Sequence, residues 1–321
     1  MIKSALTFLS GLSVAIIGFA AFSSEQTTKP ELPQMLSFSA TPRFENHIEI
    51  FGQKVDLSRW DLHERYEREL TSFCFSHNNT LLTLKRANRL FPIICPILKE
   101  EGVPEDLIYL CCIESTLNTR AKSPAKAAGL WQFMESTGKE YGLQIDAEVD
   151  ERYHTEKATR AACAFFKKMY AEFGDWNSVA AGFNGGINGI RRKLEKQKAS
   201  TALDLQLVEE TSRYMFRIMA MKEIMRDPYH YGFVLYSDQL YRPISTKSIK
   251  VSSTISDLTA WAEKQGYNYL QLKEFNPWLR DTKLTVRPGK EYQILLPNKD
   301  EMNYDGKPFA IYNIKWVVDQ Q

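Results

Sequence analysis

The sequence predicts a mainly α-helical domain followed by a small α/β module. From about residue 80 to residue 227, apolar residues recur at helical spacing almost without a break. After Asp227-Pro228 the pattern changes to two short β-type runs, at 251–255 and 292–296, with two helical stretches between them. The chain has 321 residues, 44% of them hydrophobic, which is enough apolar material for the cores of about two domains.

The first 24 residues have the pattern of an export signal. Lys3 precedes an apolar run over residues 5–22, and the next charged residue is Glu25. The run is also close to the ~18 residues that can span a membrane, so an uncleaved anchor is the alternative to a cleaved signal peptide. We therefore expect an exported, periplasmic protein, and association with the inner or the outer membrane stays open. Residues 25–43 are expected to form a linker.

Residues 44–79 are expected to form a strand–helix segment. A hairpin is predicted around Phe51-Gly52-Gln53, and an amphipathic helix over residues 57–73. In the helical stretch that follows, Pro92 and Pro96 should kink or break the first helix. Residues 107–113 are nearly all apolar, which predicts a buried central helix.

Composition excludes some classes of function. Lys and Arg number 41 against 39 for Asp and Glu, a balance that argues against a protein that binds nucleic acid through its charge. The five cysteines lack the spacing of metal ligands, and we interpret them as structural. A disulfide such as Cys74–Cys95 is permitted in an exported protein, but the sequence does not establish it. We expect neither a metal nor a cofactor.

Glu114 is the first candidate for chemistry, because it ends an apolar helix that has no other reason to carry a charge. In a partly dry cleft, desolvation raises the pKa of a carboxyl group, which can then donate a proton near neutral pH. A glutamate at a helix end that faces water is the commoner case when the residue is taken alone.

Two further segments could contribute to a sugar-binding site. Gly129-Leu-Trp-Gln-Phe-Met134 holds aromatic rings that stack on sugars, and Gln132, whose amide can both donate and accept. Residues 180–186 contain three glycines, which would leave the Asn184 amide free to bind a ligand. Taken alone, either segment could equally be structural.

The order and spacing of four motifs are more specific. Together they resemble the catalytic domain of the lytic murein transglycosylases, most closely the membrane-bound type D branch, whose fold is related to that of goose-type lysozyme. The resemblance covers about residues 80–230 and implies a lysozyme-like helical catalytic domain over residues 80–232. It rests on Glu114-Ser115, Gly129-Leu-Trp-Gln-Phe-Met134, Ala180-Ala-Gly-Phe-Asn-Gly-Gly186 and Glu210-Thr-Ser-Arg-Tyr214.

The resemblance implies a role for each matching residue. Glu114 would be the catalytic acid and base, Ser115 would help to orient its carboxyl group, and Tyr214 would approach it. The family usually has Tyr where this chain has Phe183, so Tyr214 would supply the only phenolic hydrogen bond to Glu114. The remaining matches are the expected substrate-cleft residues Gln132, Met134 and Asn184.

The implied substrate is the glycan strand of peptidoglycan, and the implied reaction cleaves the β-1,4 bond between N-acetylmuramic acid and N-acetylglucosamine without water. Most glycosidases need two carboxyl groups, and the motifs here commit only one to the site. Two alternatives stay open: a hydrolytic muramidase, in which water attacks, and a non-catalytic peptidoglycan-binding scaffold. The change at Phe183 keeps the scaffold open, although it does not by itself abolish function, since the carboxyl group remains. The sequence indicates no particular protein partner.

Residues 243–321 are similar to a diverged lysin-motif (LysM) domain. The similarity rests on Asn276-Pro277 and Pro288-Gly289, while the usual opening Gly-Asp-Thr is replaced by Ser-Ser-Thr at residues 252–254. It implies a weak glycan binder that raises the concentration of the catalytic domain at the wall. A packing module without a ligand is the alternative. One or two more strands are expected in the tail, residues 309–318.

Overall fold

The computed structural model describes residues 41–320. The expected signal or anchor at 1–24, and nearly all of the expected linker, lie outside the described residues. Among the helices of residues 41–320, none is both long enough and apolar enough to cross a membrane.

The described chain begins with a hairpin and a helix, as predicted. β1 (His47–Ile50) and β2 (Gln53–Asp56) pair antiparallel. Phe51 and Gly52 form the turn, and both have positive φ, the geometry that suits the twist of a two-residue hairpin. The chain then enters α1 (Trp60–Phe75).

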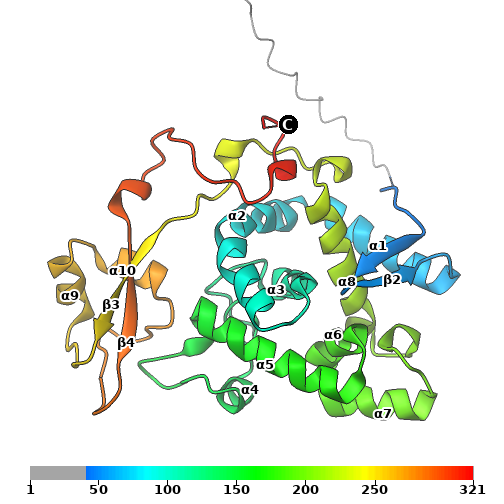
Figure 1. The fold of residues 1–321 in the computed structure, drawn as a ribbon, viewed down its shortest axis with the longest axis horizontal. Coiled ribbons are helices and arrows are strands. Elements are labelled where there is room, and N and C mark those ends of the chain that lie inside the picture. The colour runs from blue at the N-terminus through cyan, green and yellow to red at the C-terminus, as the bar shows by residue number, and fades with distance from the viewer. Residues whose placement is uncertain (1–40, 321) are drawn as a thin grey trace, which may run out of the picture. The chain divides into compact units, whose positions relative to one another are not determined.

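The helical domain surrounds one short helix, α3 (Ile108–Ser115), in which every residue except Tyr109 and Glu114 is buried. Figure 1 shows α3 enclosed by longer helices, so the prediction of a buried central helix is confirmed. The other helices of this part are α2 (His77–Glu100), α4 (Glu135–Glu140), α5 (Thr155–Phe173), α6 (Trp176–Gly185), α7 (Ile187–Gln197) and α8 (Glu209–Arg226).

Pro92 and Pro96 were expected to kink or break the first of these helices; the break is wrong, because α2 continues through both prolines. The two prolines are four residues apart and lie exposed on the same face of the helix. On that face, water can hydrate the carbonyl groups that lose an N–H donor. The opposite face of α2 is packed in the hydrophobic core, which holds the helix together.

The C-terminal module is the predicted small α/β unit. β3 (Thr246–Val251) pairs antiparallel with β4 (Tyr292–Pro297), and α9 (Leu258–Lys264) and α10 (Tyr269–Phe275) lie between them in sequence. The fold class, mainly α with a small α/β module, is therefore confirmed.

Two details of the C-terminal prediction are wrong. The first strand lies at 246–251 instead of 251–255, because the ladder ends where Val251 meets Tyr292, the first residue of β4. The tail holds only a 3₁₀ turn, Ile314–Trp316, in place of the expected strands. Side chains hold the tail instead: the Trp316 indole N–H donates to the carbonyl oxygen of Met225 on α8 at 2.6 Å.

Candidate active site

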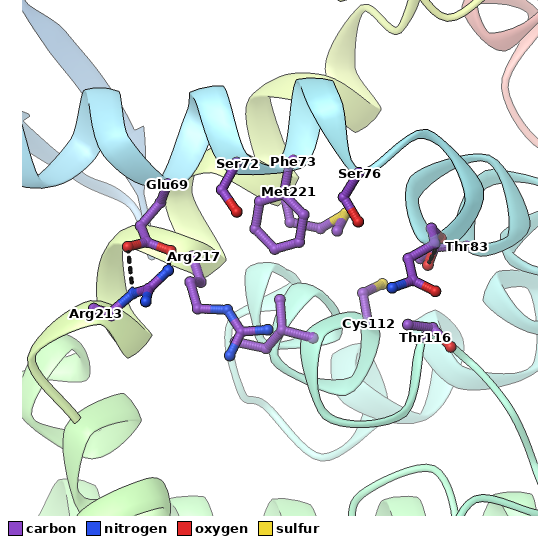
Figure 2. A pocket seen from close by; sticks show the side chains of 12 residues that line it. Glu69, Ser72, Phe73, Ser76, Thr83, Cys112, Thr116, Arg213, Arg217 and Met221 are labelled. Carbon is purple, nitrogen blue, oxygen red and sulfur yellow. Dashed lines mark hydrogen bonds and ion pairs between the residues drawn. The ribbon is translucent and has the colours of Figure 1, made fainter. Parts of the chain in front are cut away.

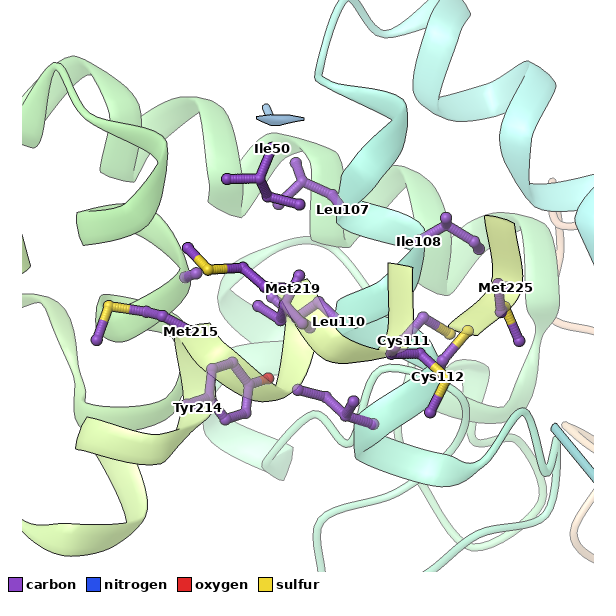
Figure 3. Packing of buried hydrophobic residues seen from close by; sticks show 14 of the residues in the cluster. Ile50, Leu107, Ile108, Leu110, Cys111, Cys112, Tyr214, Met215, Met219 and Met225 are labelled. Carbon is purple, nitrogen blue, oxygen red and sulfur yellow. The ribbon is translucent and has the colours of Figure 1, made fainter. Parts of the chain in front are cut away.

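The carboxyl group of Glu114 meets the hydroxyl of Tyr214 where α3 packs against α8. Glu114 is the penultimate residue of α3, and Thr116, in the left-handed region with φ of 50°, ends the helix directly after it. The Tyr214 hydroxyl donates a hydrogen bond to Glu114 Oε1. Tyr214 itself is only 2% exposed, and Figure 3 shows it among the packed residues of these two helices. Two residues that are 100 positions apart in sequence thus form one polar contact within an apolar setting.

Burial is the main influence on the protonation of Glu114. Desolvation raises the pKa of its carboxyl group, and the nearby charge of Glu210 adds to the rise. The hydrogen bond from Tyr214 and the positive charge of Arg217 act in the opposite direction, but the pKa stays above its ordinary value. Burial also holds the pKa of Tyr214 well above its usual range, so that its hydroxyl remains a donor. The site can therefore keep a proton on Glu114 at a higher pH than water would.

Glu210, Tyr214 and Arg217 share one face of α8, because they are separated by four and three residues. Arg217 was not among the site residues predicted from the sequence. The signal was available, since its spacing from Tyr214 places a cation beside the expected tyrosine. Its guanidinium makes no hydrogen bond or ion pair with any residue in the range 41–320, which leaves its charge free to act on Glu114.

Arg217 lines a small cavity of about 150 Å³ next to α3. Figure 2 shows the side chain extending into it, near the ion pair in which Arg213 Nε lies 2.7 Å from Glu69 Oε1. Ile113 and Thr116, on either side of Glu114-Ser115, also line it. Neither Glu114 nor Tyr214 is among the residues that line this cavity.

The Ser115 hydroxyl donates to the carbonyl oxygen of Cys111 at 3.1 Å, within its own helix. The expected bond that would orient Glu114 is not among the hydrogen bonds of the described residues. Ser115 is buried, and this bond within α3 satisfies its hydroxyl.

The loop that carries Gln132 and Met134 has two kinds of side chain. Trp131 and Phe133 are buried core residues, and the Trp131 indole N–H donates to Thr159 Oγ1 at 2.9 Å. Gln132 and Met134 point elsewhere: Met134 is 45% exposed, and Gln132 is partly buried with a φ of 49°. The aromatic residues therefore anchor the loop, and the other two are available to a ligand.

The Gln132 side chain is partly used to close its own loop. Its Nε2 donates to the carbonyl oxygens of Gly129 at 2.8 Å and Ala121 at 3.3 Å. Its amide oxygen accepts no hydrogen bond from residues 41–320. One acceptor thus stays available at this position.

Phe183 and Asn184 lie near the end of α6. Asn184 Oδ1 accepts a hydrogen bond from Thr211 Oγ1 at 2.8 Å, and Thr211 is one turn before Tyr214 on α8. The Phe183 ring packs against an aromatic cluster, with centroids 5.3 Å from Phe166 and 5.6 Å from Phe165. Within the part of the chain that the structure describes, no hydrogen bond joins either residue to Glu114.

All five cysteines are buried and free. Burial raises the pKa of each thiol, with Cys74 and Cys95 at about 11. These properties fit the interpretation of the cysteines as packing residues.

Comparison with known proteins adds two family matches. Residues 92–205 match the family described as Transglycosylase SLT domain, and residues 247–300 match the Soluble lytic transglycosylase C-terminal LysM-like domain. The chain is 28% identical over 243 residues to the membrane-bound lytic murein transglycosylase D of Escherichia coli K12. The match covers 74% of this chain and 52% of the relative, so the chain spans about half the length of that protein. The same figures hold for its counterpart in Escherichia coli O6:H1.

Among solved structures, the chain is similar to the 70 kDa soluble lytic transglycosylase from Escherichia coli, with a TM-score of 0.38 and 18% identity. The match covers 52% of this chain and 31% of that one. This similarity is too low for a comparison of the two sites.

Proposed function

Because the chain carries a transglycosylase SLT domain and a LysM-like domain of the lytic transglycosylase type, we propose that it is a lytic transglycosylase that cleaves peptidoglycan glycan strands. The bond cut is the β-1,4 linkage from N-acetylmuramic acid to N-acetylglucosamine, and Glu114 is the general acid and base. The observation that supports this most is the desolvated Glu114 carboxyl group bonded to the buried Tyr214 hydroxyl.

In the first step, protonated Glu114 donates its proton to the glycosidic oxygen while the bond from that oxygen to C1 of the muramic acid breaks. The raised pKa favours this step, since it keeps the carboxyl group protonated. The acetamido group of the muramic acid stabilises the positive charge that develops at C1.

In the second step, the Glu114 carboxylate takes the proton of the C6 hydroxyl of the same sugar. The C6 oxygen bonds to C1, which closes a 1,6-anhydro ring and returns Glu114 to its protonated form. Water is neither consumed nor released. Between the two steps Glu114 is charged, and the Tyr214 hydroxyl and the Arg217 guanidinium are placed to stabilise that charge.

The other residues serve substrate binding in this proposal. The free Gln132 oxygen, the exposed Met134 and the Asn184 amide nitrogen would contact the sugars. Ser115 and Phe183 would support them, Ser115 through the end of α3 and Phe183 through its aromatic packing. The catalytic domain would span residues 80–232, the LysM-like module residues 243–321, and the strand–helix segment residues 44–79.

The protein would act in the periplasm, where its substrate lies, with residues 1–24 as export signal or membrane anchor. The E. coli relative is named as membrane-bound, which supports a location at a membrane.

The direct test replaces Glu114 by Gln, which keeps the shape of the side chain but cannot donate the proton. Release of soluble fragments from purified sacculi should fall by about 10²- to 10⁴-fold, the usual range for general acid–base catalysis. Glu195→Gln, on the exposed surface of α7, is the matched control and should keep full activity. Near-normal activity of the Glu114 variant would remove this residue from its role.

Mass spectrometry of the released fragments identifies the reaction. Anhydro ends lack the elements of one water relative to reducing ends and are the expected product. Reducing ends would show a hydrolytic muramidase instead. Binding to sacculi without release of any fragment would show a non-catalytic scaffold.

A further inference from the structure

The C-terminal module is bonded to residues 148–150 of the helical domain much as a strand is bonded to its neighbour. Val149 and Leu279 form an antiparallel bridge. The Asp150 N–H donates to the carbonyl oxygen of Trp278 at 2.9 Å, and the Arg280 N–H donates to that of Glu148 at 2.7 Å. The contact is therefore made by backbone groups of both the module and the helical domain.

Side chains extend this contact. The Glu148 carboxylate accepts hydrogen bonds from the N–H of Thr285 at 2.6 Å and from its hydroxyl at 3.0 Å, and Lys283 lies 3.3 Å away. The Arg280 guanidinium lies 4.3 Å above the ring of Tyr153. The interface is thus polar at its edge.

The centre of the interface is apolar. Ala128, Val149 and Tyr153 of the helical domain belong to the same buried cluster as the core of the module, which includes Trp278 and Leu279. Leu279 and Ala128 are completely buried. Separating the module would expose this shared core to water, so the module is packed on the helical domain and does not hang from a linker.

From this interface a buried ion pair leads toward the candidate site. Asp150 and Arg152 are both buried, and Arg152 holds the Asp150 carboxylate with two bonds, of 2.9 Å from Nε and 2.7 Å from Nη2. Arg152 Nη1 also donates to the carbonyl oxygens of Lys126 at 3.0 Å and Phe133 at 3.2 Å. These two carbonyl groups flank the loop in which Gln132 lies.

The loop also touches the backbone of Arg152. A β-carbon added at Gly129 would lie 1.8 Å from the Arg152 carbonyl oxygen, far closer than two non-bonded atoms can approach. Arg152 therefore contacts the loop at three points. Its guanidinium bonds to the carbonyl groups of Lys126 and Phe133 at the two ends of the loop, and its own carbonyl group lies against Gly129 between them.

We infer that the C-terminal module is a working part of the substrate cleft, because residues 278–280, acting through Asp150 and Arg152, hold the loop that carries Gln132 and Met134 in its binding position. The inference rests on the proposed function, in which these two residues contact the glycan. Arg152 is a positioning residue here, since it acts on substrate through the loop. A module that only tethered the enzyme to the wall would leave the cleft unchanged when its contacts were weakened.

The test uses the full chain with soluble, uncross-linked glycan strands, a substrate that needs no attachment to the wall. Arg152→Lys keeps the charge but cannot reach Asp150 and both carbonyl groups at once. Glu148→Ala removes the side-chain bonds to Thr285 at the interface itself. Lys250→Ala is the control within the module, because it breaks only an exposed ion pair with Glu291 on the small sheet.

Both test variants should raise KM for the soluble strands by roughly 5- to 20-fold, the range expected when one or two hydrogen bonds are lost, and should change kcat much less. Backbone amides in residues 121–134 should also exchange their hydrogens faster in both variants. Lys250→Ala should match the parent protein in KM and in exchange.

Unchanged KM and unchanged exchange in both variants would overturn the inference, and weaker binding to sacculi alone would identify a tether. If Arg152→Lys does not fold, Glu148→Ala decides the matter. If the parent protein cleaves no glycan, the proposed function fails, whereas hydrogen exchange still reports on whether the module holds the loop.

Discussion

The two halves of the candidate site are held in different ways. Glu114 and Tyr214 lie where two core helices pack, and burial by apolar neighbours positions them. Gln132 and Met134 lie on a loop between α3 and α4, and hydrogen bonds from a buried arginine position that loop. Glu114 and Tyr214, which would carry out the chemistry, are held by the core of the helical domain. Gln132 and Met134, which would bind the sugar, depend on contacts that begin in the C-terminal module.

This difference has a consequence for mutation. A change near Glu114 should alter the rate or its pH dependence, because the environment of the carboxyl group sets its proton affinity. A change in the loop region should alter stability or substrate affinity, because its polar contacts fix the shape of the loop.

The largest effect is expected for Gly129→Ala in the loop half. The new β-carbon would overlap the Arg152 carbonyl oxygen, and the φ of 76° is unfavourable for alanine. We expect a loss of about 3 kcal/mol or more in the free energy of unfolding, measured by denaturant titration. Gly142→Ala is the matched control, since its φ is 84° but nothing lies within 4 Å, so only about 1 kcal/mol should be lost. Equal losses would argue against the close approach at Gly129.

Tyr214→Phe tests the chemistry half. The ring stays buried, but the carboxylate formed in the first step loses its hydrogen-bond donor. A hydrogen bond to a charged group contributes about 1.5–3 kcal/mol, so kcat on soluble strands should fall by roughly 10- to 100-fold. Tyr229→Phe, at a tyrosine that is 58% exposed, should leave kcat unchanged. An unchanged kcat for Tyr214→Phe would mean that its hydroxyl plays no part in the reaction.

Arg217→Gln and Glu210→Gln should shift the pH profile in opposite directions. Activity requires protonated Glu114, so kcat/KM falls as pH rises through the pKa of this carboxyl group. The charge of Arg217 lowers the pKa of Glu114, so Arg217→Gln should move the decrease in kcat/KM to higher pH. The charge of Glu210 raises this pKa, so Glu210→Gln should move the decrease to lower pH. Each shift should be up to about one pH unit. Shifts in the same direction would contradict the assignment of the decrease in kcat/KM at high pH to Glu114.

The smallest effect is expected for Phe183→Tyr, which restores the hydroxyl that the family usually has. The carboxyl group already accepts a bond from Tyr214, so activity should change by less than about threefold. The free energy of unfolding should change by about 1 kcal/mol or less, because Phe183 is only partly buried and its new hydroxyl can reach water. A tenfold gain in kcat would show that the added hydroxyl reaches Glu114.

Local patterns in the sequence predicted much of the fold. The hairpin around Phe51-Gly52, the buried helix before Glu114 and the helices α9 and α10 all follow from periodicity and turn residues, which act over a few neighbouring positions. The errors arose where distant contacts decide. Core packing carries α2 through two prolines, and pairing with β4 sets the position of β3.

The candidate site divides in the same way. The motifs were sufficient to select Glu114, Gln132, Asn184 and Tyr214, whose roles stay predictions. They could not show that the Ser115 hydroxyl bonds within its own helix, that the charge of Arg217 lowers the pKa of Glu114, or that Arg152 bonds to the loop of Gln132.

By itself, the sequence determined the fold class, the central apolar helix and the carboxyl group at its end, because these depend on residue types at short spacing. Only the tertiary structure decided how strongly Glu114 holds its proton and what supports the loop of Gln132. Both depend on partners brought together from distant positions, Tyr214 and Arg217 for the carboxyl group and residues 278–280 for the loop, and spacing along the chain does not encode how close such partners come.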